Sequence, residues 1–290
     1  MLTRSFIHLP GVGPLQERGF WNDGQICWDD VLGQRDLFDE GPAPALEREL
    51  TQSRERLSAG DARWFEQRLG AEQAWRMAAD FDDGRIAYLD IETDGSKPDA
   101  VQPEDGEPGG TTVVAVWDGA DARVFLRGRD LEEIPEYLSK YKVLCTFNGK
   151  CFDIPYLEGR FGKNFFGGAH LDLRPITRVV GLTGGLKKIE QQIGIERPAD
   201  IRRYTGYDAV KLWGAFQRGR KDALVPLARY CLYDTINLQT VLRVAYNWST
   251  VFDELPFRRF DEVQTNCVHE AAQRAIEEMC RPLSKSVAVI

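Results

Sequence analysis

The chain has 290 residues, and 43% of them are hydrophobic, which is enough to bury a core in one large domain or two modest ones. Its 45 acidic and 37 basic residues give a net charge of −8, which argues against a protein that coats nucleic acid without specificity. No run approaches the roughly eighteen apolar residues of a membrane span, and residues 1–10 show no signal-peptide pattern, so no membrane partner is expected.

The six cysteines and three histidines do not suggest a disulfide framework or a zinc site. No two cysteines have CxxC spacing, and the chain is longer than the small domains that depend on disulfides. His8, His170 and His269 lie far apart, and none is near a pair of cysteines. Reduced thiols and a cytoplasmic location are therefore expected.

Two short helices around a glycine-rich turn are expected at the N-terminus, in residues 1–35. The turn is LPGVG at residues 9–13, and Leu15 and Phe20 would form the apolar side of the helix that follows it. Such a pair resembles a helix-hairpin-helix element, which binds a sugar-phosphate backbone through N–H groups at a helix start. A small helical cap without nucleic-acid contact is an equally good interpretation, because this segment is acidic.

Residues 36–84 are expected to form a helical arm that packs against the rest of the chain. Apolar residues such as Leu50, Phe65 and Trp75 recur at near-helical spacing. Gly60 marks a break between two helices of this arm.

After the arm, strands and helices alternate before the chain becomes mostly helical. The expected strands cover residues 85–93, 111–117, 122–126 and 142–147. The expected helices cover residues 131–140, 153–161, 186–193, 209–218, 223–248 and 261–279. A loop rich in Gly, Pro, Asp and Glu is expected at residues 95–110. This order of elements predicts an α/β fold with a mixed sheet.

Asp90 and Glu92 stand two residues apart at the end of an apolar strand. Side chains alternate along a strand, so both carboxylates point to the same face. Neighbouring carboxylates repel each other unless a cation lies between them, and burial makes an uncompensated pair costly. A metal ion is therefore the natural partner, although a solvated strand end would also explain the pair.

Asp153 begins a predicted helix just after the strand that ends at Phe147. An isolated Asp at this place would be interpreted as a helix cap. Asn148 can form a hydrogen bond with a carboxylate or a phosphate, and Lys150 supplies a free cation near any scissile phosphate.

Tyr230 and Asp234 share one face of a predicted helix, because they are four residues apart. Asp is unfavourable in the middle of a helix, and a metal ion would explain its presence there. An Asp on the solvent side of the helix is the alternative. Asp172 follows a strand or turn and is a further candidate near the site, but a cap before Arg174 is the favoured interpretation.

Together these pieces resemble the three motifs of the DEDD superfamily of 3′–5′ exonucleases, in the order that this superfamily uses. The tyrosine four residues before the last Asp resembles the DEDDy branch. The segments LDIETDG, FNGKCFDIPYLEGRF and LKKIEQQIGIER most resemble the predicted exonucleases of the YprB type. The resemblance covers residues 85–248 with specific motifs and the first 32 residues more loosely. One departure is the long acidic stretch at 95–110, where the superfamily often uses a short apolar wedge against the terminal base.

The resemblance implies an RNase H-like mixed β-sheet flanked by helices in residues 85–248, with a helical tail at 249–290. It also implies a hydrolase that removes nucleotides from the 3′ end of single-stranded DNA or RNA. Two Mg²⁺ or Mn²⁺ ions would be needed, and a set of carboxylates with few histidines suits such hard cations. A catalytically weak nucleic-acid-binding module and a structure-specific endonuclease on the same fold are the alternatives.

The resemblance assigns roles to residues as follows. The implied metal ligands are Asp90, Glu92, Asp153 and Asp234. Tyr230 joins them as a catalytic residue that orients the attacking water or helps to deprotonate it. The candidates for substrate contact are Thr93, Asn148 and Lys150.

Overall fold

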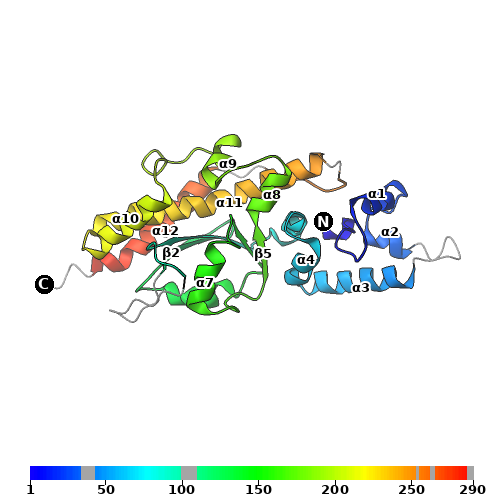
Figure 1. The fold of residues 1–290 in the computed structure, drawn as a ribbon, viewed down its shortest axis with the longest axis horizontal. Helices are drawn as coiled ribbons and strands as arrows, with labels where there is room; N and C mark the ends of the chain where they lie inside the picture. The colour runs from blue at the N-terminus through cyan, green and yellow to red at the C-terminus, as the bar shows by residue number, and fades with distance from the viewer. Residues whose placement is uncertain (34–42, 99–109, 253–254, 262–264, 286–290) are drawn as a thin grey trace.

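The computed structural model describes residues 1–33, 43–98, 110–252, 255–261 and 265–285 (Figure 1). The molecule is elongated, with a β-sheet and its helices at one end and the first helices of the chain at the other. Most of the loop expected at residues 95–110 lies outside the described residues.

A five-stranded mixed sheet forms the centre of the larger end. Its strands are β1 (Ile86–Thr93), β2 (Thr111–Trp117), β3 (Ala122–Leu126), β4 (Val143–Thr146) and β5 (Ala169–Asp172). The strand order is β3-β2-β1-β4-β5; β2 is antiparallel to β1 and β3, whereas β1, β4 and β5 are parallel. The sequence prediction of an α/β fold with a mixed sheet is confirmed.

Each face of the sheet is covered by helices (Figure 1). On one face, Leu89 and Ile91 pack with apolar residues of η4 (Leu131–Glu133), α6 (Ile134–Leu138) and α7 (Asp153–Phe161). On the other face, Tyr88 packs with residues of the 29-residue helix α11 (Leu224–Phe252). Because side chains alternate along β1, Asp90 and Glu92 lie on the same face of the sheet as Tyr88.

Shorter helices join α11 on its side of the sheet. They are α8 (Leu173–Val179), α9 (Leu186–Gln192), α10 (Gly206–Gln217) and the turn η5 (Lys221–Ala223). The helix α12 (Thr265–Lys285) packs against β3 and α11, at the edge of the sheet opposite to β5. The sequence predicted these helices except α8, and Pro226 fits the first turn of α11.

The N-terminal part is helical, as expected. It contains η1 (Leu2–Arg4), α1 (Pro14–Asn22), α2 (Trp28–Leu32), α3 (Pro44–Ser58), α4 (Ala62–Leu69), η3 (Ala74–Met77) and α5 (Ala78–Phe81). Glu17 lies buried at its centre, where Oε1 accepts hydrogen bonds from the Phe6 N–H at 2.7 Å and from Nη1 of Arg76 at 2.8 Å. The expected apolar side of α1 was wrong for Leu15, which is 82% exposed, because α1 buries the face that carries Glu17.

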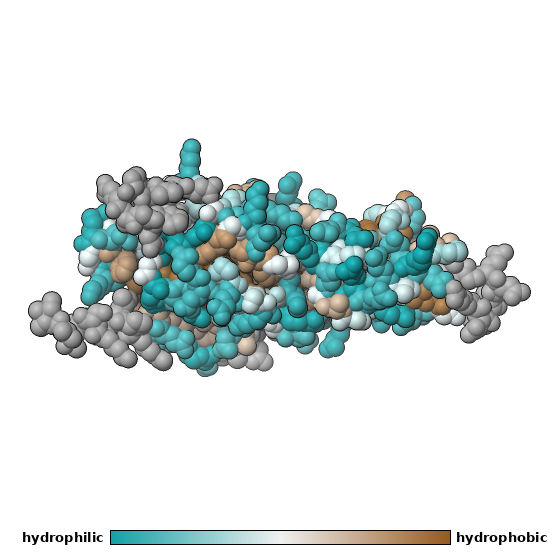
Figure 2. All heavy atoms as spheres, turned by 90° about the horizontal axis from the view of Figure 1, so that it is seen from below, coloured by the Kyte–Doolittle hydropathy of each residue, from teal (hydrophilic) through white to brown (hydrophobic). Residues whose placement is uncertain are grey.

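The surface seen from below is mostly hydrophilic and shows hydrophobic atoms in separate patches (Figure 2). Within the described residues, no helix combines the length and the apolar character that crossing a membrane requires. The cysteines whose side chains are described carry free thiols, as their spacing predicted: Cys27, Cys145, Cys151, Cys231 and Cys280.

Candidate active site

Four carboxylates from β1, α7 and α11 gather in one place. Asp90 and Glu92 come from β1, Asp153 is the first residue of α7, and Asp234 lies in α11. Asp90 is half-buried, and the other three are buried. The charges of Asp234 and Asp153 both contribute to the raised pKa values of Asp90 and Glu92, so the group is close in space although it is distant in sequence.

Burial and mutual repulsion disfavour ionisation of this group. Burial, followed by the neighbouring carboxylates, raises the pKa of Asp90 and of Glu92 well above the usual range. Burial also raises the pKa of Asp153 to about 7, and it raises the pKa of Asp234. A bound divalent cation would reverse this cost, because it stabilises the ionised form of every carboxylate around it.

The donor atoms suit a hard cation. Oδ1 of Asp153 is buried and has no hydrogen-bond partner among the described residues, which leaves a lone pair available for a metal ion. Ligand atoms of Asp90, Glu92 and Cys231 lie within 4.8 Å of one another. The Cys231 thiol donates a hydrogen bond to the carbonyl oxygen of Asp90, and burial raises its pKa. With the thiol hydrogen-bonded to a backbone carbonyl, the remaining donor atoms are carboxylate oxygens, which suit Mg²⁺ or Mn²⁺.

Tyr230 lies one helical turn before Asp234 and is only 6% exposed. Burial, with the Asp234 charge as the next cause, raises its pKa, so the phenol stays protonated. Nζ of Lys187 lies 4.6 Å from the centroid of its ring. The protonated phenol can donate a hydrogen bond at the edge of the carboxylate group.

Asp234 also belongs to a buried ionic network that the sequence did not reveal. Nε and Nη2 of Arg197 donate to the two carboxylate oxygens of Glu190, each at 2.6 Å. Nη2 of Arg197 also pairs with Oδ1 of Asp234. Nδ2 of Asn237 donates to Oε1 of Glu190 at 2.8 Å, which ties the network to α11. Glu190 and Arg197 belong to the segment LKKIEQQIGIER. This segment was identified only by its resemblance to other sequences, and neither residue was predicted to have a role.

The candidates for substrate contact lie in different surroundings. Asn148 has a positive φ of 63°, and its Oδ1 accepts a hydrogen bond from Nη1 of Arg174 at 2.6 Å. Nζ of Lys150 lies 3.5 Å from Oε1 of Glu66 in α4, so Lys150 is not the free cation that the sequence suggested. Thr93 is buried at the end of β1, and its hydroxyl accepts from the Gly95 N–H at 3.4 Å.

Asp172 organises the turn between β4 and α7. Its side chain accepts from the backbone N–H of Arg174 at 3.0 Å, so the prediction of a helix cap is confirmed. It also accepts from the backbone N–H groups of Asn148 at 2.8 Å and Lys150 at 3.1 Å. The same carboxylate therefore caps α8 and holds the turn that leads to Asp153.

A cleft of about 670 Å³ opens beside the carboxylates. Asp90 and Asp153 contribute to its wall, together with Asn148 and Phe152 from the β4–α7 connection. The other wall is formed by α8 and the turn after it, as follows: Arg174, Thr177, Arg178, Leu182, Thr183, Gly184, Gly185 and Leu186. The cleft therefore joins two of the carboxylates to two arginines.

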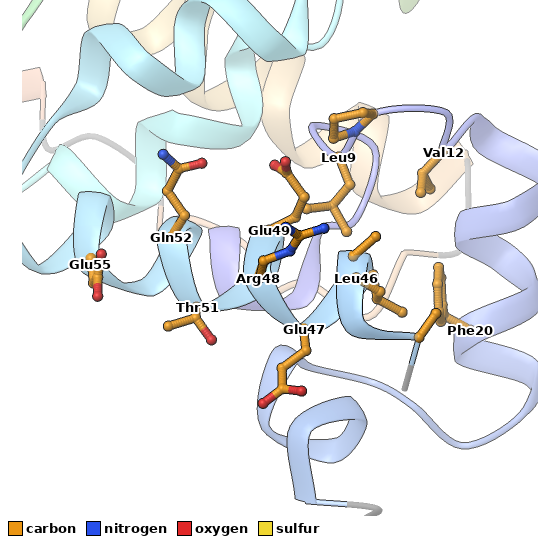
Figure 3. Close-up of a pocket in the computed structure, with 13 residues that line it drawn as sticks. Leu9, Val12, Phe20, Leu46, Glu47, Arg48, Glu49, Thr51, Gln52 and Glu55 are labelled. Atoms are coloured by element: carbon orange, nitrogen blue, oxygen red, sulfur yellow. The ribbon is translucent and has the colours of Figure 1, made fainter. Parts of the chain in front are cut away.

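A larger cleft of about 960 Å³ lies in the N-terminal part (Figure 3). Leu9 and Phe20 line it opposite α3, which contributes Glu47, Glu49 and Glu55. These acidic side chains do not suit a phosphate backbone, so nucleic-acid binding by the helix-hairpin-helix-like segment stays a prediction without support from this cleft.

The model of the RNase_H superfamily matches residues 87–246, which is more than half of the chain. The chain belongs to the RNase_H superfamily. The matched residues of this RNase_H superfamily member contain the five strands, except Ile86 at the start of β1, and all four carboxylates. Among curated proteins, none matches the chain significantly.

A solved structure that is similar to this RNase_H superfamily chain is the family B DNA polymerase from the hyperthermophilic archaeon Pyrobaculum calidifontis. The TM-score is 0.39 and the sequence identity is 15%. The match covers 58% of this chain and spans 27% of the length of the polymerase chain.

Proposed function

We propose that this member of the RNase_H superfamily is a metal-dependent 3′–5′ exonuclease that hydrolyses phosphodiester bonds of single-stranded DNA or RNA. The observation that carries the proposal is the group of the half-buried Asp90 and the buried Glu92, Asp153 and Asp234, with an unpartnered oxygen on Asp153. A group of this kind gains stability from divalent cations and otherwise resists ionisation.

Asp90, Glu92, Asp153 and Asp234 would hold two Mg²⁺ or Mn²⁺ ions, which supply an activated water and neutralise charge on the leaving oxygen. Tyr230 lies one helical turn before Asp234, and burial with the Asp234 charge raises the pKa of its phenol, so in this role it donates a hydrogen bond that orients the water. Arg197 holds Asp234 in place, and the cleft admits the substrate strand beside Asp90 and Asp153.

The test compares cleavage of 3′-labelled and 5′-labelled single-stranded oligonucleotides, in DNA and RNA, with Mg²⁺, Mn²⁺ or EDTA. Asp90→Asn should lower the rate by at least about 100-fold, because it removes a charge at the centre of the site. Asp121→Asn is the matched control, since Asp121 is exposed in the β2–β3 turn. Cleavage that persists in EDTA or in Asp90→Asn would contradict the proposal.

The same experiment separates the alternatives. A circular single strand has no end, so its cleavage would identify an endonuclease. Binding of oligonucleotides without cleavage in any metal would identify a nucleic-acid-binding module.

A further inference from the structure

Arg174 and Arg178 lie four residues apart on α8, so they share one face of this helix. Both side chains are exposed, and both line the cleft that Asp90 and Asp153 also line. The position of α8 is fixed at its start, where Asp172 caps it and also holds the β4–α7 turn. Asp172 therefore fixes the start of the helix that carries both arginines, and it also positions the turn that leads to Asp153.

The two arginines differ in what they already bind. Nη1 of Arg174 donates to Oδ1 of Asn148 at 2.6 Å, so part of its guanidinium is committed to the turn. The side chain of Arg178 forms no ion pair or hydrogen bond with any described residue. A guanidinium carries several N–H donors in a planar fork that matches a phosphate, and those of Arg178 are available.

The charges of the residues that line the cleft also determine where a negatively charged ligand can bind. Its wall carries the carboxylates of Asp90 and Asp153 at one place and the guanidinium groups of α8 at another. An anion that is not neutralised by a metal ion is repelled by the carboxylates and attracted by the arginines. A strand with several phosphates can place one phosphate at the carboxylates, with metal ions between them, and another phosphate at the arginines. A ligand with a single phosphate can bind at only one of these two sites.

We propose, on the basis of the exonuclease function above, that Arg178 binds a phosphate upstream of the scissile phosphate. Arg178 is then a substrate-binding residue that recognises a chain of nucleotides rather than a single phosphodiester. The ligand is the phosphate backbone of an unpaired strand, bound without regard to base sequence, since the contact reaches only the backbone.

The first test compares two substrates of different length. One is a single-stranded oligonucleotide, and the other is the p-nitrophenyl ester of thymidine 5′-monophosphate, which has one phosphate. Arg178→Ala should raise the KM for the oligonucleotide about tenfold, with kcat little changed, and should leave hydrolysis of the ester unchanged. Arg178→Lys should have a smaller effect, because the charge remains while the planar fork is lost.

Arg274→Ala is the matched control, because Arg274 is exposed on α12, which packs at the β3 edge and not at the β5 edge where α8 begins. This variant should have the KM of the wild type for both substrates. Thermal unfolding of each variant shows whether the fold is kept, which is expected for exposed side chains.

The second test measures binding without cleavage. Fluorescence anisotropy of a labelled oligothymidylate in EDTA should show weaker binding by Arg178→Ala. The slope of log K against log salt concentration should fall by about 0.7, the value for one contact with a single strand. Replacing one phosphate at a time by a neutral methylphosphonate should locate a single position at which Arg178→Ala has no further effect.

The outcomes separate this inference from the proposed function. If the wild type cleaves neither substrate, the exonuclease proposal fails, and the anisotropy measurement alone decides the role of Arg178. Equal KM and equal salt slopes for wild type and Arg178→Ala would overturn the inference. An equal loss of rate on the oligonucleotide and on the ester would also overturn it, because it would place Arg178 at the scissile phosphate.

Discussion

Arg197 forms an ion pair with Asp234 in the protein interior, and the same guanidinium is held by both oxygens of Glu190. Burial raises the pKa of Asp234, and the Arg197 charge acts in the opposite direction. Arg197 therefore favours the ionised form of one implied metal ligand and fixes its orientation. The segment that carries Glu190 and Arg197 is coupled in this way to the helix that carries Asp234.

Replacing Arg197 tests whether this network serves stability, catalysis or both. Arg197→Met should lower the free energy of unfolding by about 3–5 kcal/mol, because it leaves Glu190 buried without its partner. The double variant Glu190→Leu with Arg197→Met should recover much of this stability, since a buried ion pair can be replaced by packed apolar groups. Chemical denaturation gives both values.

Activity of the double variant separates the two roles. If Arg197 positions Asp234, kcat should stay reduced by about tenfold or more even though stability has returned. Wild-type kcat in the double variant would show that the network is only structural.

The raised carboxyl pKa values predict how the stability of the metal-free protein depends on pH. Above about pH 7, the buried His8 and His170 are neutral in the folded state, where their pKa values are about 3 and about 4, and mostly neutral in the unfolded chain, where the pKa is about 6.5. The carboxyl groups then determine how the free energy of unfolding changes with pH. In the unfolded chain they are ionised, but in the folded protein Asp153 has a pKa of about 7 and binds a proton in this range.

The folded state thus holds more protons than the unfolded state between about pH 7 and pH 8, so stability falls as the pH rises. In EDTA, the melting temperature should decrease over this range, and Mn²⁺ should remove most of the decrease. Asp153→Asn should raise the melting temperature at pH 8 by a few degrees and weaken the response to Mn²⁺. A melting temperature in EDTA that does not change with pH would contradict this account.

Much of the fold was predictable because its signals are local. The run of β-branched and apolar residues at 111–117 and the turn after Trp117 gave the bounds of β2 and β3, and the Asn148-Gly149 turn before Asp153 indicated the start of α7. The helix α8 was missed, because it is short and contains Pro175. The cap at Asp172 was recognised, but the helix that it caps was not.

The contacts that were missed join residues whose positions depend on packing. Lys150 reaches Glu66, which lies 84 residues earlier in the chain, and no local pattern predicts this pair. Arg197 forms an ion pair with Glu190 across the turn at Gly194. It forms an ion pair with Asp234 only because α11 packs beside this turn. Charge alone could not tell that Arg197 is buried.

The neutral phenol of Tyr230 leads to a prediction about the pH profile of the reaction. Tyr230→Phe should lower kcat by about ten- to a hundredfold, because a hydrogen bond that orients the water is lost. The shape of the kcat–pH profile should not change, since the phenol does not titrate near neutral pH.

Tyr233→Phe is the matched control on the same helix. The Tyr233 hydroxyl lies 2.8 Å from Nδ1 of His269 on α12, away from the carboxylates. Its kcat should equal that of the wild type. A profile that loses a titration step only in Tyr230→Phe would instead assign Tyr230 as a base.

Two neighbouring glycines before β5 offer a test of how closely the strands pack at the edge of the site. A Cβ added at Gly168 would lie 2.3 Å from the backbone oxygen of Lys142, which accepts the first hydrogen bond that joins β5 to β4. A Cβ added at Gly167 would meet nothing within 4 Å, and its φ is not in the left-handed region.

Gly168→Ala should therefore lower the free energy of unfolding by about 1–3 kcal/mol, because backbone atoms must shift to relieve the contact. Gly167→Ala should be neutral or more stable by up to about 1 kcal/mol, since it restricts only the unfolded chain. Chemical denaturation of both variants measures the difference. Because β5 ends at Asp172, which holds the turn leading to Asp153, Gly168→Ala should also slow cleavage, whereas equal stability of the two variants would show that β5 tolerates a shift here.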